Sequence, residues 1–341
     1  MGEASLTRVE DDVLGTSLRL VVPPALESER VDRALALLAG ISRADASRIV
    51  TEGKVRVGGV PVKAGSKRLR GGDLLEAALP SEVAAPPGAA TSGISAPSPA
   101  PPEATVVFAD EDLLVVDKPA GLVMHPGAGN REGTLVQQLL TAFPDIAGAG
   151  PPGDRPGIVQ RLDKGTSGLL VVARSPDARQ ALAAQLAARS MERRYLAVVH
   201  GEVEADEGLV EAPLGRSPSE PVKMAVVAGG RPARTRYWAQ ARSASPLPTT
   251  LVSCQLDTGR THQVRAHLAA IGHPVLGDDR YSKPGQLAAA RATLPDLSRP
   301  WLHAARLGFV HPRTGQAMSF GSEPPRELAE VLEALGLANG I

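Results

Sequence analysis

The sequence of 341 residues has few of the residue types that build disulfides, soft-metal sites or stacking surfaces. Cys254 is the only cysteine, which excludes an intrachain disulfide and a CxxC metal site and is typical of a reducing cytoplasm. The two Trp, three Tyr and four Phe are too few for an aromatic platform that stacks bases. No apolar run approaches the roughly 20 residues of a membrane-spanning helix. The acidic N-terminus has no apolar core, so we expect no signal peptide.

Motifs for common cofactors are also missing. The sequence has no GxxxxGK[ST] phosphate loop and no GxSxG nucleophile elbow. Gly127-Ala-Gly129 only half matches a GxGxxG loop, and no ribose-binding acid follows it. His262 and His267 are separated by one residue too many to share a helix face as a pair of metal ligands. The sequence therefore predicts neither a cofactor nor a metal.

The residues that are present describe a globular chain with an uneven charge distribution. Hydrophobic residues make up 43% and charged residues 22%, and the formal net charge is zero. Between positions 30 and 70, however, ten basic residues stand against three acidic ones, a net charge of +7. A basic segment joined to a compensating remainder is typical of a nucleic-acid-binding module. A solvated basic face without a partner has the same composition.

Changes of pattern divide the chain into four parts. Residues 1–27 show weak periodicity and are interpreted as an extension. Residues 28–80 contain two helical periods, a pair of short strands joined by two glycines, and a closing strand. Residues 81–104 are rich in proline and alanine and form a linker. Residues 105–338 form the large domain.

The large domain mixes strands with irregularly spaced helices. Apolar runs predict strands at 106–108, 113–116, 194–199, 251–256 and 302–310. Helices are expected to begin at about 134, 175, 261 and 325, and residues 285–300 are interpreted as a surface insertion. We therefore expect an α+β fold with a mixed or antiparallel sheet.

One run stands out in this domain. Residues 157–173 place Arg161 and Asp163 on a polar turn between two apolar segments. Buried strands on both sides would hold Asp163 at the floor of a cleft, where a lone carboxylate acts as nucleophile or base without a cofactor. The alternative is an ordinary turn in which Asp163 caps the backbone. A glycosidase would need a second acid, for which Asp257 and Asp278 are the candidates.

Four segments of the basic module follow a known pattern. They are Arg30-Val-Asp-Arg33, Gly40-Ile-Ser-Arg43, Gly53-Lys-Val-Arg-Val57 and Gly72-Asp73. In these segments the module resembles the S4 RNA-binding domain. The resemblance implies that the second helix and the following hairpin face structured RNA. The side chains on that side are Arg43, Arg48, Lys54 and Arg56.

Six motifs occur in the large domain in a characteristic order. They are Asp117-Lys-Pro-Ala-Gly121, His125-Pro-Gly-Ala-Gly-Asn130, Arg161-Leu-Asp-Lys-Gly-Thr-Ser-Gly168, Arg194-Tyr-Leu-Ala-Val198, Thr258-Gly-Arg-Thr-His-Gln-Val-Arg265 and Leu302-His-Ala-Ala-Arg-Leu307. In these motifs the domain resembles the RluA-type family of pseudouridine synthases, and closely its RluD type, which modifies large-subunit ribosomal RNA. The departures are the long linker and Gln160, where the family usually has His.

The resemblance implies an isomerisation in which the N1–C1′ bond of a uridine breaks and the uracil is rejoined through C5, without a cofactor. Asp163 is then the catalytic carboxylate, which attacks the nucleoside or removes a proton from it. Tyr195 is expected to stack on the uracil and to assist proton removal from C5. Arg260 is expected to pair with Asp163 and to keep it ionised.

Three more residues are expected at the substrate. Arg161 should position the extruded nucleotide or fill the gap that it leaves, because the target base must leave the RNA helix to be reached. Val264 should line the uracil pocket. For Arg265, structural pairing and substrate contact are both open.

We therefore expect a cytoplasmic, monomeric RNA pseudouridine synthase whose partner is large-subunit rRNA or the assembling large ribosomal subunit. One alternative is a paralogue that acts on other rRNA or tRNA uridines. The other is an RNA-binding ribosome-assembly factor that keeps the fold without turnover.

Overall fold

The computed structural model describes residues 17–22, 26–39, 43–78, 101–126, 132–150, 156–220, 223–294 and 297–340. Most of the predicted linker, 81–104, lies outside these residues. The chain divides into two compact units, one of which contains the N-terminal module and the other the large sheet.

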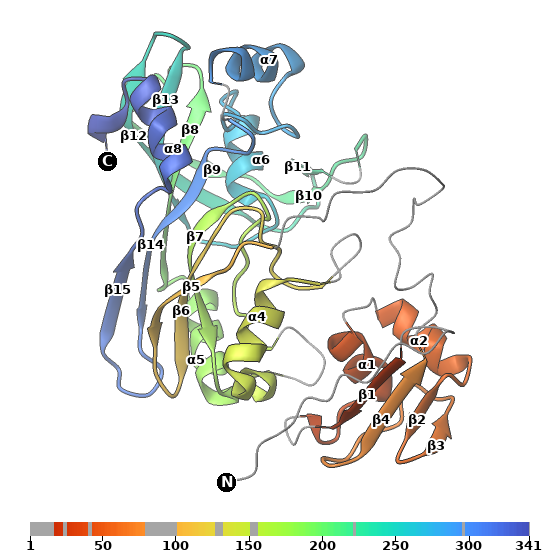
Figure 1. Cartoon of the computed structure of the whole chain (residues 1–341). Helices are drawn as coiled ribbons and strands as arrows, with labels where there is room; N and C mark the ends of the chain where they lie inside the picture. Colours follow the sequence, from red (N-terminus) through yellow and green to blue (C-terminus); the bar gives the residue numbers. More distant parts are fainter. Residues whose placement is uncertain are drawn as a thin grey trace. The chain divides into compact units, whose positions relative to one another are not determined.

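The N-terminal module, residues 17–78, is a four-stranded antiparallel sheet with two helices (Figure 1). Its elements are β1 (Ser17–Val21), α1 (Val31–Ala39), α2 (Arg43–Thr51), β2 (Val55–Val57), β3 (Val60–Val62) and β4 (Leu74–Ala78). The strand order is β1-β4-β2-β3. Strand β1 falls in the segment interpreted as an extension, so the module begins before residue 28. Leu35, Ile49 and Leu75 from helices and sheet share its core.

The large sheet has nine strands in the order β5-β6-β7-β14-β8-β13-β12-β9, with β15 paired to β14. They are β5 (Thr105–Ala109), β6 (Leu113–Lys118), β7 (Ser167–Ala173), β8 (Glu192–His200), β9 (Glu207–Glu211), β12 (Arg234–Ser243), β13 (Thr249–Leu256), β14 (Leu302–Val310) and β15 (Ala317–Gly321). A separate hairpin is formed by β10 (Leu214–Arg216) and β11 (Met224–Val226). The predicted α+β class with a mixed sheet is confirmed, since β14 runs parallel to β7 and antiparallel to β8.

Strand β14 lies between two strands that are consecutive along the chain. Strands β7 and β8 are joined by a single helix, yet β14 separates them in the sheet (Figure 1). The parallel contact is close at Gly168, whose φ is +109°. A Cβ at this position would meet the Ala304 carbonyl oxygen at 2.3 Å, so the pairing requires glycine. Strand β14 thus connects β7 to β8 within one sheet.

The helices of this part of the chain are α4 (Leu135–Ala142), α5 (Pro176–Ala187), α6 (Gln263–Ala270), α7 (Pro284–Thr293) and α8 (Arg326–Ala334), with 3-10 turns at Pro144–Gly148 and Ala338–Gly340. Helices α7 and α8 share a core with Trp301 and with β8 and β13. Residues 285–300 are therefore not the surface insertion that was predicted, because Ala290 and Leu294 are buried in that core. Among the described helices, none has the length and apolar character that crossing a bilayer requires.

Candidate active site

The turn that carries Asp163 is fixed by its backbone. The Thr166 N–H donates to the Asp163 carbonyl at 3.0 Å, and the Gly121 N–H donates to the Lys164 carbonyl at 2.8 Å. The backbone carbonyls therefore make the hydrogen bonds of the turn. The Asp163 side chain remains 24% exposed and its carboxylate bonds elsewhere. This is not the arrangement of an aspartate that only caps a turn.

Lys118 supports the same turn from inside the protein. It is fully buried, and its Nζ donates to the Leu122 carbonyl at 3.0 Å and lies 3.5 Å from the Lys164 carbonyl oxygen. Burial and, to a lesser extent, the charge of Arg299 lower the pKa of Lys118 to about 7, against the opposing charge of Asp163. The Asp-Lys-Pro-Ala-Gly motif thus serves as scaffold for the turn.

The cation that holds Asp163 comes from α6. Arg265 Nη1 donates to Asp163 Oδ2 at 3.1 Å. The other edge of the guanidinium donates to Asp278, from Nε to Oδ2 at 2.6 Å and from Nη2 to Oδ1 at 2.8 Å. Burial alone would lower the pKa of Arg265, but the hydrogen bonds and charge of Asp278, together with Asp163, raise it above its ordinary value. Arg265 is therefore a permanent cation.

This geometry corrects the predicted ion pair between Arg260 and Asp163. Helix α6 begins at Gln263, and Arg260 lies in the turn before it, where its side chain is held by other partners. The Arg260 Nε donates to the Pro232 carbonyl at 3.2 Å, and its N–H donates to Gln263 Oε1 at 3.0 Å. Of the two interpretations left open for Arg265, the structure shows the pairing.

Two site residues were not found from the sequence. His262 has a left-handed backbone (φ 54°) at the start of α6, and its Nε2 lies 3.9 Å from Asp163 Oδ2. Burial lowers the pKa of His262, and so does the charge of Arg265, while Asp163 opposes this. The Tyr281 hydroxyl lies 3.2 Å from His262 Nδ1, and its ring faces the Arg265 guanidinium at 5.2 Å. The sequence feature that could have indicated Tyr281 is the run Asp278-Asp-Arg-Tyr281, which comes shortly after α6.

Tyr195 lies on β8 with only 7% of its surface exposed. Burial raises its pKa to about 12, Arg193 opposes this, and the negative charge of Asp163 adds to it. The phenol is therefore neutral at every physiological pH, and the charge of Asp163 acts on it. A shared site for these two residues stays a prediction.

The other predicted substrate residues lie where the Asp163 turn meets α6. Arg161 is exposed and its Nη2 donates to Thr261 Oγ1 at 2.9 Å. Val264, in the first turn of α6, is buried at 4% exposure. Turn and helix therefore meet through side chains one hundred positions apart in the sequence.

The predicted RNA-facing residues of the N-terminal module occupy α2 and the strand that follows. Arg43 is the first residue of α2. The side chains of Arg48 and Lys54 are 57% and 43% exposed and each pairs with an acidic neighbour. Arg56 is exposed on β2. The side chains of Arg48, Lys54 and Arg56 are accessible to a polyanion.

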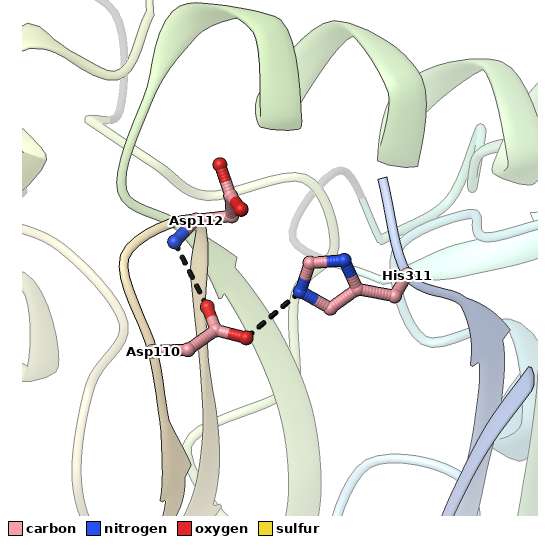
Figure 2. Close-up of side chains that lie close together, drawn as sticks. All are labelled: Asp110, Asp112 and His311. Carbon is pink, nitrogen blue, oxygen red and sulfur yellow. Dashed lines mark hydrogen bonds and ion pairs between the residues drawn. The ribbon is translucent and has the colours of Figure 1, made fainter. Parts of the chain in front are cut away.

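One group of residues has the composition of a metal site. Asp110, Asp112 and His311 bring their ligand atoms within 4.8 Å of one another (Figure 2). His311 Nδ1 accepts the N–H groups of Arg313 and Thr314, both at 3.2 Å, so the ring proton lies on Nε2 and is donated to Asp110 at 2.8 Å. Neither ring nitrogen therefore presents a lone pair to a metal, and these residues do not fit a cation site.

Two family models match the chain. One is described as RNA pseudouridylate synthase and matches residues 112–270, and the other is the S4 domain at residues 29–75. Among solved structures, human RNA pseudouridylate synthase domain containing 1 is 25% identical with a TM-score of 0.52, covering 68% of this chain and 87% of that chain. Human RNA pseudouridylate synthase domain containing 4 is also 25% identical, with a TM-score of 0.53, covering 68% and 92%.

Several curated relatives are similar over much of the chain. The ribosomal large subunit pseudouridine synthase D of Nitrosomonas europaea is 44% identical over 230 residues, which span 67% of this chain and 64% of that protein. The protein of the same name in Xanthomonas campestris is 38% identical and covers 94% of each chain. An uncharacterized RNA pseudouridine synthase of Chloroflexus aurantiacus is 40% identical, covering 98% of this chain and 96% of its own length.

Proposed function

The chain belongs to the RNA pseudouridylate synthase family, which are isomerases, and we propose that it converts specific uridines of large-subunit ribosomal RNA to pseudouridine. The names of the relatives from Nitrosomonas and Xanthomonas support this substrate. The observation that carries the proposal is the Asp163–Arg265 pair, together with the effect of the Asp163 charge on the neutral phenol of Tyr195.

Asp163 is proposed as the catalytic carboxylate. It attacks the nucleoside or removes a proton from it, while the hydrogen bond from Arg265 orients it. Tyr195 stacks on the uracil and assists removal of the C5 proton once the base has been rejoined through C5. All atoms of the uridine are retained, so the isomerisation has no need of a cofactor. No catalytic role is proposed for Arg260.

The target base leaves the RNA helix to reach Asp163. Arg161 is exposed on the same turn, so its guanidinium is suited to position the extruded nucleotide or to fill the gap in the stack. Val264 supplies an apolar wall to the uracil pocket.

The N-terminal module is proposed to supply RNA affinity through Arg43, Arg48, Lys54 and Arg56. These contacts would be made to phosphates and would therefore weaken with salt. The enzyme is proposed to act in the cytoplasm as a monomer, on rRNA or on the assembling large ribosomal subunit.

The test is the variant Asp163→Asn, which keeps the shape of the side chain and removes its charge. Full-length protein is incubated with an unmodified large-subunit rRNA transcript, and pseudouridine is quantified by position. We expect turnover to fall by about 10⁴-fold or more, with RNA binding and melting temperature near normal. Asp206→Asn, at a side chain that is 88% exposed, is the matched control. Turnover of Asp163→Asn within tenfold of the wild type would refute the assignment, and retained function in cells would favour an assembly factor.

A further inference from the structure

A buried carboxylate behind Arg265 has no place in the reaction described so far. Asp278 is fully buried, and its Oδ1 accepts two backbone N–H groups of the following turn at 3.0 and 3.3 Å. The preceding residue, Gly277, has a φ of +77°, and a Cβ there would meet the Arg299 carbonyl oxygen at 2.3 Å. The backbone is thus locked on both sides of Asp278.

Asp278 occupies one whole edge of the Arg265 guanidinium. Two nitrogens of Arg265 meet two oxygens of Asp278 at 2.6 and 2.8 Å, which is a bidentate, charge-assisted pair. Because the guanidinium is planar and rigid, fixing this edge also fixes the direction of Nη1. Nη1 is the atom that donates to Asp163 Oδ2 at 3.1 Å.

Tyr281 holds the plane of the same guanidinium. The Arg265 Cζ lies 5.2 Å from the centroid of the Tyr281 ring, within the range of a cation–π contact. The Tyr281 hydroxyl is itself anchored, because it donates to the Met224 carbonyl at 3.0 Å and accepts the Met224 N–H at 3.1 Å. A ring fixed in this way prevents the guanidinium from tilting away from Asp278.

We propose that Asp278 and Tyr281 are positioning residues. They orient Arg265 so that it donates to Asp163 through one nitrogen instead of two. Arginine frequently pairs with a carboxylate through two nitrogens, and such a pair would cover both oxygens of Asp163. Because Asp278 occupies the Nε and Nη2 edge of the guanidinium, Arg265 donates a single hydrogen bond to Asp163. This leaves Asp163 Oδ1 for the nucleoside. This inference rests on the proposed catalytic role of Asp163.

The competing explanation is that Asp278 only neutralises a buried arginine. Both explanations predict lower stability for Asp278→Asn, because the new amide N–H would face the Arg265 N–H groups. They differ in the turnover of the folded protein. A neutralising role leaves kcat of the folded fraction unchanged, whereas a positioning role lowers kcat and spares KM.

The experiment measures kcat and KM of full-length Asp278→Asn on an unmodified large-subunit rRNA transcript. The matched control is Asp279→Asn, at the exposed neighbouring position. We expect kcat to fall about 100-fold, as for a misplaced catalytic group, with KM within about threefold of the wild type. A folded Asp278→Asn protein with wild-type kcat would overturn the inference.

Two further variants keep the inference testable if Asp278→Asn does not fold. Tyr281→Leu removes the stacked ring and leaves the charged groups in place, and we expect kcat to fall about tenfold without loss of RNA binding. Arg265→Lys cannot bridge two carboxylates through a fork. In the Arg265→Lys background, Tyr281→Leu and Asp278→Asn should each change kcat by less than about twofold. If each substitution changed kcat by the same factor in the wild-type and Arg265→Lys backgrounds, Asp278 and Tyr281 would act without Arg265.

Asp163→Asn in the same assay separates the two proposals. Turnover by Asp163→Asn would refute the proposed function. An inactive Asp163→Asn together with wild-type kcat in Asp278→Asn and Tyr281→Leu would refute only the positioning role.

Discussion

Two groups of side chains in the large-sheet unit are built from the same residue types. The site cluster consists of Asp163, Asp278, Arg265 and His262. The hairpin cluster consists of Asp110, Asp112, Arg313 and His311, and it joins the turn after β5 to the turn after β14. Figure 2 draws Asp110, Asp112 and His311. In each cluster an arginine makes a bidentate pair with one aspartate. The two clusters differ in what remains available after these contacts.

In the hairpin cluster the remaining contacts are hydrogen bonds between residues of the two turns. Asp110 accepts the N–H groups of Asp112 and Leu113 on one oxygen and His311 on the other. Burial would raise the pKa of Asp110, but these hydrogen bonds lower it below its ordinary value. Such a group is suited to hold two turns together.

In the site cluster the second aspartate is left with spare capacity. Within the described part of the chain, the Asp163 carboxylate receives one hydrogen bond, and His262 Nε2 at 3.9 Å is too distant for another. The same residue types therefore form a structural tie in one place and leave a carboxylate with hydrogen-bonding capacity in the other. What separates them is how completely each carboxylate is hydrogen-bonded.

Among the variants that test this comparison, Tyr195→Phe should have the largest effect, because the hairpin cluster has no counterpart of this tyrosine. The substitution keeps the ring that is proposed to stack on the base and removes the hydroxyl that is proposed to assist proton transfer. We expect kcat on the rRNA transcript to fall about 100-fold, with RNA affinity and melting temperature unchanged. A kcat within threefold of the wild type would confine Tyr195 to packing.

Asp112→Asn should distinguish the hairpin cluster from the site cluster, because it should lower the melting temperature without lowering kcat. It breaks the pair with Arg313, whose side chain is 62% exposed, so we expect the melting temperature to fall by only about 2–4 °C. Because the hairpin cluster takes no part in the reaction, kcat should remain at the wild-type value. Glu111→Gln, at a side chain that is 87% exposed, is the control for the loss of charge. A large loss of turnover in folded Asp112→Asn would remove the distinction between the clusters.

The smallest effect concerns acid stability and His262. Its pKa in the folded chain is lowered from the ordinary 6.5, chiefly by burial. Below pH 6.5 the unfolded chain therefore binds a proton that the folded chain resists, and stability falls as the pH decreases. We expect His262→Gln to lose less stability than the wild type between pH 7 and pH 5, as measured by chemical denaturation.

The hairpin cluster should respond in a different pH range. The lowered pKa of Asp110 contributes stability that is present above its ordinary value of 3.8 and lost as the pH falls through the folded-state value. Asp110→Asn should therefore match the pH dependence of the wild type between pH 7 and pH 5. If it flattens that dependence as His262→Gln does, the assignment of the two pH ranges is wrong.

Much of the fold could be predicted from local pattern. The strands at 113–116, 251–256 and 302–310 were found because buried strands are apolar and β-branched, and the N-terminal hairpin because two glycines favour its turn. The prediction that residues 285–300 form a surface insertion was wrong. A short alanine-rich helix has little periodicity, and this one owes its burial to Trp301 and α8.

The candidate site shows the same division. The motifs predicted Asp163 and Tyr195, and their shared site and their roles remain predictions. The sequence did not distinguish Arg260 from Arg265, because the two contacts that separate them are tertiary: Arg260 donates to the Pro232 carbonyl, whereas Arg265 donates to Asp163. Asp278 was recognised only as a possible second acid, because nothing in the sequence indicates that its partner is Arg265.

The position of β14 has a consequence for the order of events during synthesis. The turn with Asp163 precedes β7 and Tyr195 lies on β8, but the strand that separates β7 from β8 in the sheet is residues 302–310. A nascent chain that has passed Tyr195 holds both residues without the strand that sets their spacing, and without Arg265 and Asp278. Such non-local pairing forms late and slowly. The proposed site can therefore be assembled only after residues 302–310 have been synthesised.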